Sequence, residues 1–122
     1  MRGRSLSSVA IKSANRERIT RAVRDYVAQL RAEHVQVERV IWFGSWVNGI
    51  PTPGSDVDLC LIVSSSEQRP GDRAAAYLPV GFLVGVDLFV YTPAEFEQLR
   101  QVSPTWYAAI VAGREVMGEQ YK

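Results

Sequence analysis

Two short apolar runs, residues 40–43 and 59–63, enclose a polar loop, and this arrangement constrains the fold more than any other part of the sequence. Each run is rich in β-branched or aromatic residues and is bounded by Gly, Pro or Ser, which is typical of a buried strand. A Gly-Ser pair follows the first run, and two aspartates one residue apart precede the second. The sequence therefore predicts two buried strands joined by a loop that carries charged and hydroxyl side chains.

The two aspartates of this loop, Asp56 and Asp58, are expected to point to the same side, because side chains alternate between the two faces of a strand. Two carboxylates at the edge of an apolar core repel each other and are costly there unless a positive group lies between them. A divalent metal is the simplest such group. Mg²⁺ fits best, because it keeps several waters and shares its coordination shell with substrate phosphates.

The Gly-Ser pair, Gly44 and Ser45, predicts a place for those phosphates. Glycine lets the backbone approach a ligand closely, and exposed N–H groups at the start of a helix attract phosphate. The Ser45 hydroxyl can donate a hydrogen bond to a phosphate oxygen, and Asn48 can do the same. A phosphate cradle beside a metal-binding carboxylate pair describes a site for phosphoryl or nucleotidyl transfer.

The spacing of these residues resembles that of the minimal nucleotidyltransferases of the DNA polymerase beta superfamily. The shared pattern is a Gly-Ser pair, ten residues, and then Asp-x-Asp. The likeness extends over about residues 14 to 118 and includes a second glycine, a serine before the first aspartate, and a third aspartate on a neighbouring strand. These last three are Gly49, Ser55 and Asp87.

The resemblance implies a nucleotidyltransferase fold and a Mg²⁺-dependent reaction with ATP. Asp56, Asp58 and Asp87 would be the catalytic, metal-holding carboxylates, and Asp87 would also accept the proton of the attacking group. The nucleotide would be held by the loop residues Gly44, Ser45, Asn48 and Ser55.

The sequence departs from the family at two positions just after the Gly-Ser pair. Family members often carry arginines there, whereas this chain has Trp46 and Asn48. Trp46 either stacks on a ligand or packs in the core. Arg69 or Arg73, from a polar segment between strands, could supply the missing positive charge.

The length indicates one domain, residues 1–122. The order of its elements and the resemblance imply an α/β fold with a small mixed sheet and helices packed on it. The net charge of +1 does not favour direct binding of nucleic acid, and the single cysteine, Cys60, suits a reducing cytoplasm. We find no signal peptide and no stretch of transmembrane length. Cys60 lies within a predicted strand, where it is expected to be a small buried apolar residue.

The order of elements follows from periodicity and from helix start signals. Residues 1–12 are rich in Arg and Ser and are expected to be flexible. Helices are predicted over 13–34, 73–78, 93–102 and 104–112, and strands over 35–43, 56–63 and 80–91, with a possible edge strand at 115–117. The Asp-x-Asp strand is expected at the centre of the sheet. Arginines that decorate the first helix form either a solvated face or a docking face for an acidic partner.

Three functions fit these observations. The first, implied by the antitoxin branch of the family, is transfer of AMP from ATP to a tyrosine hydroxyl of a small all-helical HEPN toxin encoded next to this chain. The second is nucleotidyl transfer to a small molecule such as an antibiotic, in enzymes that usually carry a second domain. The third is a non-catalytic module that binds and neutralises its partner. The three aspartates favour an enzyme, and the missing arginines favour the third function.

Overall fold

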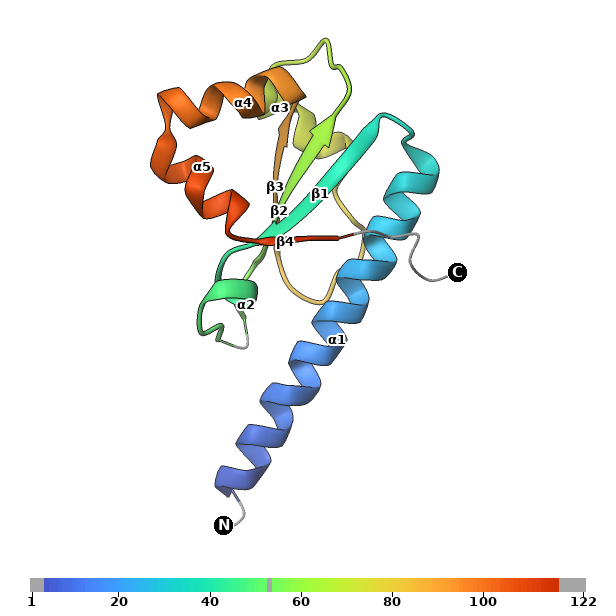
Figure 1. Cartoon of the computed structure of the whole chain (residues 1–122). Helices are drawn as coiled ribbons and strands as arrows, with labels where there is room; N and C mark the ends of the chain where they lie inside the picture. Colours follow the sequence, from blue (N-terminus) through green and yellow to red (C-terminus); the bar gives the residue numbers. More distant parts are fainter. Residues whose placement is uncertain (1–3, 53, 117–122) are drawn as a thin grey trace.

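The computed structural model describes residues 4–52 and 54–116, and the side chains from residue 15 onward. A four-stranded mixed sheet forms its centre, with the strand order β3-β2-β1-β4 (Figure 1). The strands are β1 (Val37–Phe43), β2 (Val57–Val63), β3 (Val86–Tyr91) and β4 (Arg114–Glu115). The helices are α1 (Arg4–Glu33), α2 (Ser45–Asn48), α3 (Pro70–Arg73), the 3₁₀ turn η1 (Ala74–Ala76), α4 (Pro93–Val102) and α5 (Pro104–Val111).

Strand β2 lies between β1 and β3, as the sequence predicts. It pairs antiparallel with β1 and parallel with β3. Phe43 of β1 is opposite Asp58 of β2, and Asp58 is in turn opposite Asp87 of β3. The register therefore places one aspartate of the Asp-x-Asp pair directly beside the third aspartate.

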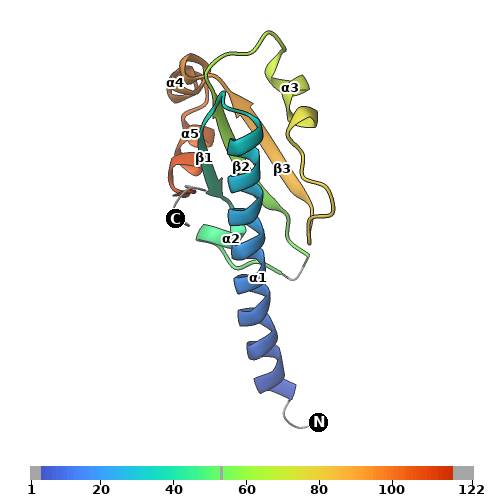
Figure 2. The same cartoon turned by 90° about the vertical axis from the view of Figure 1, so that its right-hand side faces the viewer.

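Helices cover both faces of the sheet, with α1 on one face and α4 and α5 on the other (Figure 2). The α1 side is a core built on residues that recur at helical spacing, namely Ile19, Val23, Val27 and Leu30. The α4/α5 side holds a second cluster, which includes Phe43, Cys60, Ile62, Phe96 and Ile110. Cys60 is fully buried, in agreement with the prediction for it.

Helix α4 begins where the sequence predicts, because its start signal is local. The Thr92 hydroxyl accepts a hydrogen bond from the Glu95 amide, and the Glu95 carboxylate accepts one from the Thr92 amide. This reciprocal capping box satisfies two backbone donors that a helix start would otherwise leave unpaired. Pro93 occupies the first turn, where its missing N–H costs nothing.

Several predicted boundaries are corrected by the structure. Helix α1 begins at Arg4 rather than Ser13, so it runs through most of the segment expected to be flexible; no Gly or Pro interrupts the chain there. Strand β3 begins at Val86 rather than Val80, and Val80 is fully exposed. The predicted helix at 73–78 is instead α3 followed by η1, since Pro70 starts the first turn.

An edge strand forms near the predicted place, but it spans Arg114–Glu115 rather than 115–117. Val116 is outside the strand, and Met117 lies outside the described residues. Gly113 precedes this strand, and a Cβ there would collide with the Trp42 carbonyl and the Phe43 side chain. The glycine therefore lets the chain pass close to β1. Within the described residues, no helix is both long enough and apolar enough to cross a membrane.

Candidate active site

The three predicted carboxylates gather at one end of β2 and β3. Asp58 and Asp87 are register partners on adjacent parallel strands, so their side chains leave the same face of the sheet. By the same alternation, Asp56 shares this face, two residues before Asp58. This is the face covered by α4 and α5. Asp58 shares it with Cys60, two residues later, and with its register partner Phe43, and both of these pack in the cluster that includes residues of α4 and α5. Asp56 and Asp87 are exposed, whereas Asp58 is partly buried.

Gly85 makes room for the first of these carboxylates. A Cβ added at Gly85 would collide with the carboxylate of Asp56. The Gly85 carbonyl also accepts a hydrogen bond of 2.8 Å from the Val57 amide, which holds the start of β3 against the start of β2. From the sequence, Gly85 only marks a loosened strand start, because its role depends on which strand becomes its neighbour.

Gly44 makes room for the second carboxylate. Its φ of 89° is in the left-handed region that favours glycine, and a Cβ there would collide with a carboxylate oxygen of Asp58. The Gly44 carbonyl accepts hydrogen bonds from the amides of Val47 and Asn48 and so starts α2. The turn that was predicted to cradle phosphate therefore lies against the carboxylate that was predicted to hold metal.

Ser45 is the first residue of α2, and Gly49 lets the chain pass close to it. A Cβ at Gly49 would be only 3.1 Å from the Ser45 Cα atom. The amides of Ser45 and Trp46 are those that the start of a helix leaves without an intrahelical acceptor. Together with the Ser45 hydroxyl they provide hydrogen-bond donors beside the carboxylates.

Trp46 packs in the core rather than stacking on an exposed ligand site. Its ring is buried, and its indole N–H donates to the Ser55 carbonyl over 2.8 Å. Arg16 of α1 lies over the ring, with the guanidinium carbon 5.9 Å from its centroid, and donates a 2.7 Å hydrogen bond to the Trp46 carbonyl. A cation thus reaches α2 from α1, although none follows the Gly-Ser pair in sequence.

The other two predicted nucleotide-binding residues have structural partners. The Asn48 amide donates to the carbonyl of Ala112 over 2.8 Å, which ties α2 to the end of α5. The Ser55 hydroxyl accepts a 2.8 Å hydrogen bond from the Thr52 amide and so shapes the loop before Asp56. Both residues hold the surroundings of the carboxylates in place.

Arg69 and Arg73, which were considered as substitutes for the missing positive charge, form ion pairs elsewhere in the molecule. Arg73 is buried and pairs with Glu95 at 2.6 Å, and it also donates to the Val90 carbonyl, near the far end of β3 from Asp87. Arg69 is exposed and pairs with Asp72. The structure thus corrects the prediction, because a local ion pair holds each of them away from the carboxylates.

Among the three aspartates, Asp58 is the one with a clearly shifted pKa. Its pKa is raised from 3.8 to about 6, first by burial and then by the charges of Asp87 and Asp56. A protonated Asp58 also hydrogen-bonds Asp87, which raises the pKa further. Negative charge is therefore concentrated at this end of the sheet, and no described cation lowers the pKa of Asp58.

The donor set suits a hard divalent cation. Carboxylate oxygens are the ligands that Mg²⁺ prefers. Burial and then repulsion by Asp87 and Asp56 raise the pKa of Asp58, and a bound cation would offset both effects. Within the described ranges, no group of three or more His, Cys, Asp or Glu side chains is placed to hold a metal ion by itself. Mg²⁺ commonly completes its shell with water and substrate phosphates, so the Asp58–Asp87 pair, with Asp56 beside it, fits the ion.

Comparisons with known proteins agree with this arrangement. The family model of the central palm domain of mitochondrial-like poly(A) RNA polymerase matches residues 4–103. A crystal structure of a putative nucleotidyltransferase from Sulfolobus solfataricus is similar in fold, with a TM-score of 0.56 and 23% sequence identity over 70% of this chain and 77% of that one. A comparison with curated proteins finds no match.

Proposed function

The chain belongs to the family of the mitochondrial-like poly(A) RNA polymerase central palm domain, within the polymerase beta-type nucleotidyltransferase superfamily. On this basis we propose that it transfers AMP from ATP to a hydroxyl group: the hydroxyl oxygen bonds to the α-phosphorus, the bond to the β-phosphate breaks, and pyrophosphate leaves. The observation that carries the proposal is the alignment of Asp58 with Asp87 across parallel strands, with the Gly44 turn against Asp58. Carboxylates and a phosphate-binding turn are the two parts that such a reaction needs side by side.

Each part has a role in the proposed reaction. Ser45 and the backbone of the Gly44 turn bind the outer phosphates of ATP. Asp56, Asp58 and Asp87 would hold Mg²⁺, which when bound neutralises phosphate charge and lowers the pKa of the attacking hydroxyl. Asp87 is exposed, so it can accept the proton of an acceptor that arrives from solvent.

For the acceptor we propose a tyrosine hydroxyl on a small all-helical partner protein, which would make this chain an adenylylating antitoxin of a HEPN-type toxin. Exposure of Asp56 and Asp87 supports an acceptor that is part of a macromolecule, because a side chain on another protein can reach them. A tyrosine hydroxyl has an ordinary pKa of about 10 and needs a base or a metal to become a nucleophile.

The match to a poly(A) RNA polymerase palm favours a second acceptor, the 3′-hydroxyl of an RNA chain. The chemistry at the α-phosphate is the same, and only the docking of the acceptor differs. The net charge of +1 supports the protein acceptor, because binding of nucleic acid relies on many phosphate contacts from Lys and Arg.

Nucleotide binding is tested first, by calorimetric titration of the protein with ATP in the presence and absence of Mg²⁺. We expect binding that needs Mg²⁺ and that Asp58→Asn abolishes. Ser45→Ala removes a hydrogen bond to a charged group and should weaken ATP binding about ten- to a hundredfold. Ser64→Ala, at an exposed serine beyond β2, is the matched control. Binding that is independent of the metal and unchanged in Asp58→Asn would refute the assignment.

Acceptor identity is tested by intact-mass spectrometry of the product of the neighbouring reading frame, after incubation with ATP and Mg²⁺. Added adenylyl mass that disappears with Asp87→Asn supports the protein acceptor. Extension of a short oligoadenylate under the same conditions supports the RNA acceptor instead. If the neighbour is neutralised without any change in mass, and equally well by Asp56→Asn, the chain is a non-catalytic binding module.

A further inference from the structure

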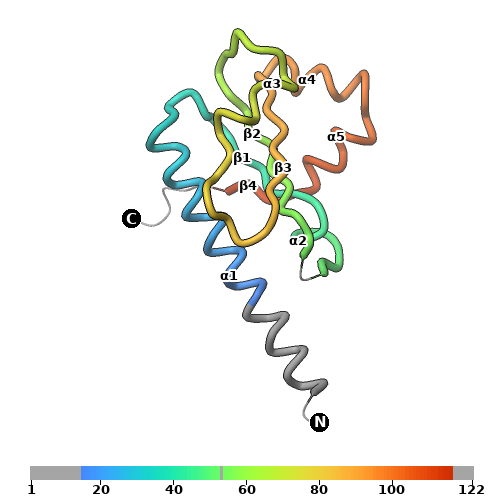
Figure 3. The backbone as a smooth tube through the Cα atoms, turned by 180° about the vertical axis from the view of Figure 1, so that it is seen from behind, coloured from blue at the N-terminus to red at the C-terminus, as the bar shows by residue number. Residues whose placement is uncertain are grey.

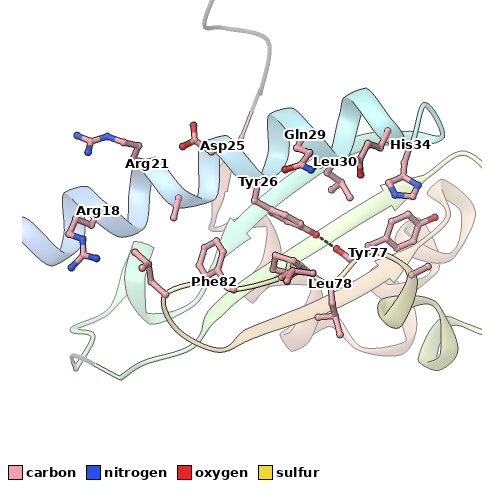
Figure 4. Close-up of a pocket in the computed structure, with 17 residues that line it drawn as sticks. Arg18, Arg21, Asp25, Tyr26, Gln29, Leu30, His34, Tyr77, Leu78 and Phe82 are labelled. Atoms are coloured by element: carbon pink, nitrogen blue, oxygen red, sulfur yellow. Dashed lines mark hydrogen bonds between the residues drawn. The ribbon is translucent and has the colours of Figure 1, made fainter.

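A groove of about 620 Å³ lies between α1 and the segment that connects η1 to β3. Figure 3 shows this segment passing beside α1 on its way back to β3. In Figure 4, Arg18 and Arg21 lie at one end of the groove and His34 at the other, with Tyr26 facing Phe82 between them. The Tyr26 hydroxyl donates to the carbonyl of Tyr77 over 2.7 Å and fixes the two walls of the groove to each other.

The α1 wall of the groove has an ordered sequence of charges. Its members follow at steps of three and four residues, so they share one face of the helix, and they are Arg18, Ala22, Asp25, Gln29 and Glu33. Arg18 and the neighbouring Arg21 have no ion-pair partner among the described residues, and Glu33 accepts a 3.1 Å hydrogen bond from Gln29. The stripe is therefore positive at its N-terminal end and negative at its C-terminal end.

We propose that this face binds a second copy of the chain, with the two α1 helices antiparallel about a two-fold axis. The midpoint between Arg18 and Glu33 falls between Asp25 and Tyr26, so an antiparallel copy places each Arg18 opposite the Glu33 of the other. Ala22 would face Gln29 of the other copy, and its small side chain allows close approach. Within one chain the two charges are about 22 Å apart along the helix and cannot pair.

The charge order selects this occupant over others. An acidic peptide or a nucleic acid strand lying along the groove would meet Arg18 and Arg21 favourably but would be repelled by Asp25 and Glu33. A second copy carries the reverse order in the antiparallel direction and pairs both ends of the stripe at once, although it also brings the two Asp25 carboxylates beside each other at the axis. An interface of this kind is self-complementary, which is the property that a two-fold dimer requires.

The wall of the groove opposite α1 exposes apolar side chains that a second copy would cover. Leu78 and Leu83 are about half exposed and Val80 is fully exposed, and all three line the groove. Exposed ion pairs contribute little by themselves, so covering these residues is expected to provide most of the affinity, and the charges are expected to set the orientation. The groove is on the α1 side of the sheet, so the dimer leaves the carboxylate face open, and the proposal does not depend on the proposed function.

Charge reversal tests the predicted pairing. Sedimentation equilibrium should show a reversible dimer for the unmodified chain. In the Arg18→Glu variant, the new carboxylate lies opposite the Glu33 carboxylate at both symmetry-related contacts. Because like charges repel, dimerisation should weaken about tenfold or more. Glu33→Arg should have the same effect, because it brings two guanidinium groups together instead. Circular dichroism shows whether each variant keeps its fold.

The decisive sample is an equimolar mixture of the two variants. In a mixed dimer each reversed charge meets its complement, so association should return to the level of the unmodified chain. Arg24→Glu is the matched control, because Arg24 is exposed on α1 but does not line the groove. An unmodified chain that is monomeric up to its solubility limit would overturn the proposal. So would a dimer that Arg18→Glu leaves intact, or a mixture that fails to associate.

Discussion

Asp58 is the residue at which stability and the proposed function conflict. Burial, followed by the charges of Asp87 and Asp56, raises its pKa to about 6, so the folded protein binds a proton there more tightly than the unfolded chain does. Its favourable contribution to stability is fully present below pH 3.8 and is lost as the pH rises through about 6. At neutral pH the metal-free protein therefore carries a destabilising charge, which a bound cation would relieve.

Asp58→Asn should accordingly stabilise the metal-free protein at pH 7.5. The expected gain in the free energy of unfolding is about 1–2 kcal/mol, allowing for solvent screening of a partly exposed group. Urea denaturation measures it, and the gain should disappear near pH 4, where Asp58 is protonated in the folded state. Asp72→Asn, at an exposed aspartate on α3, is the control. A variant that is less stable than the parent at pH 7.5 in chelator would contradict this interpretation.

Gly85→Ala tests whether the position of Asp56 depends on the neighbouring strand. The added methyl group collides with the Asp56 carboxylate, and the φ angle of Gly85 is compatible with alanine, so the fold should survive while the carboxylate moves. A displacement of about 1 Å can cost about a hundredfold in rate, and a loss of that order in nucleotidyl transfer is expected. Gly54→Ala is the control, because nothing lies near its Cβ position. Equal activity of the two variants would exclude the effect.

The carboxylates could be predicted because their grouping depends on alternation within a strand and on one strand pairing. Asp56 and Asp58 share a face in any strand, and the resemblance supplied Asp87. The two glycines could be predicted only in part. Gly44 has a local reason, its positive φ, whereas Gly85 matters because of a residue 29 positions earlier that packs against it.

Helix α2 is an element held in place from outside. Four residues are too few for a stable isolated helix, since helices shorter than about 12 residues are marginal in water. The Arg16 and Trp46 contacts fix one side of α2, and the hydrogen bond from Asn48 to Ala112 fixes the other. The turn proposed to bind phosphate therefore depends on α1 and α5, which are remote from it in sequence.

Arg16→Ala should loosen this turn. The variant loses a hydrogen bond from a charged group to the Trp46 carbonyl, and the affinity for Mg²⁺–ATP should fall about five- to tenfold. Calorimetric titration measures the change, and Arg24→Ala removes an arginine from the same helix at a position without such a contact. If both variants bind ATP like the parent, the turn is held without Arg16.

Element boundaries were predictable where their signals are local. The capping box and Pro93 identify the start of α4 from four neighbouring residues. Strand β3 was predicted six residues too long, because the apolar residues before Val86 read as a strand although they pack under α1 or face solvent. Only the tertiary fold determines where pairing with β2 begins.

At the scale of the whole molecule, one ion pair links three elements. Arg73 of α3 pairs with Glu95 of α4 and donates to the Val90 carbonyl of β3. The hydrogen bond from Arg73 lowers the pKa of Glu95 to about 2. A lowered pKa means that the carboxylate stabilises the fold above about pH 4.5 and that this contribution is lost as the pH falls toward 2.

Glu95→Gln should therefore lower the free energy of unfolding at pH 7 by about 2 kcal/mol, since it leaves the buried Arg73 without its counter-charge while the amide can still cap α4. Thermal unfolding at several pH values measures the effect. The difference from the parent should shrink between pH 4.5 and pH 2. Glu97→Gln, whose exposed partner is Arg100, should change little at any pH. A difference that does not vary with pH would show that the charge of Glu95 is not the cause.

The sheet separates α1, whose surface is proposed for association, from the face that carries the three aspartates. A substitution on the solvent side of α1 would act on the proposed association, because Asp56, Asp58 and Asp87 are on the other side of the strands. Surface diversity can therefore accumulate on α1 without loss of chemistry, provided that Arg16 and its contact with Trp46 are kept. For protein engineering, α1 is accordingly the place to randomise when a new partner is wanted, and the aspartate-bearing strand ends are the place to leave alone.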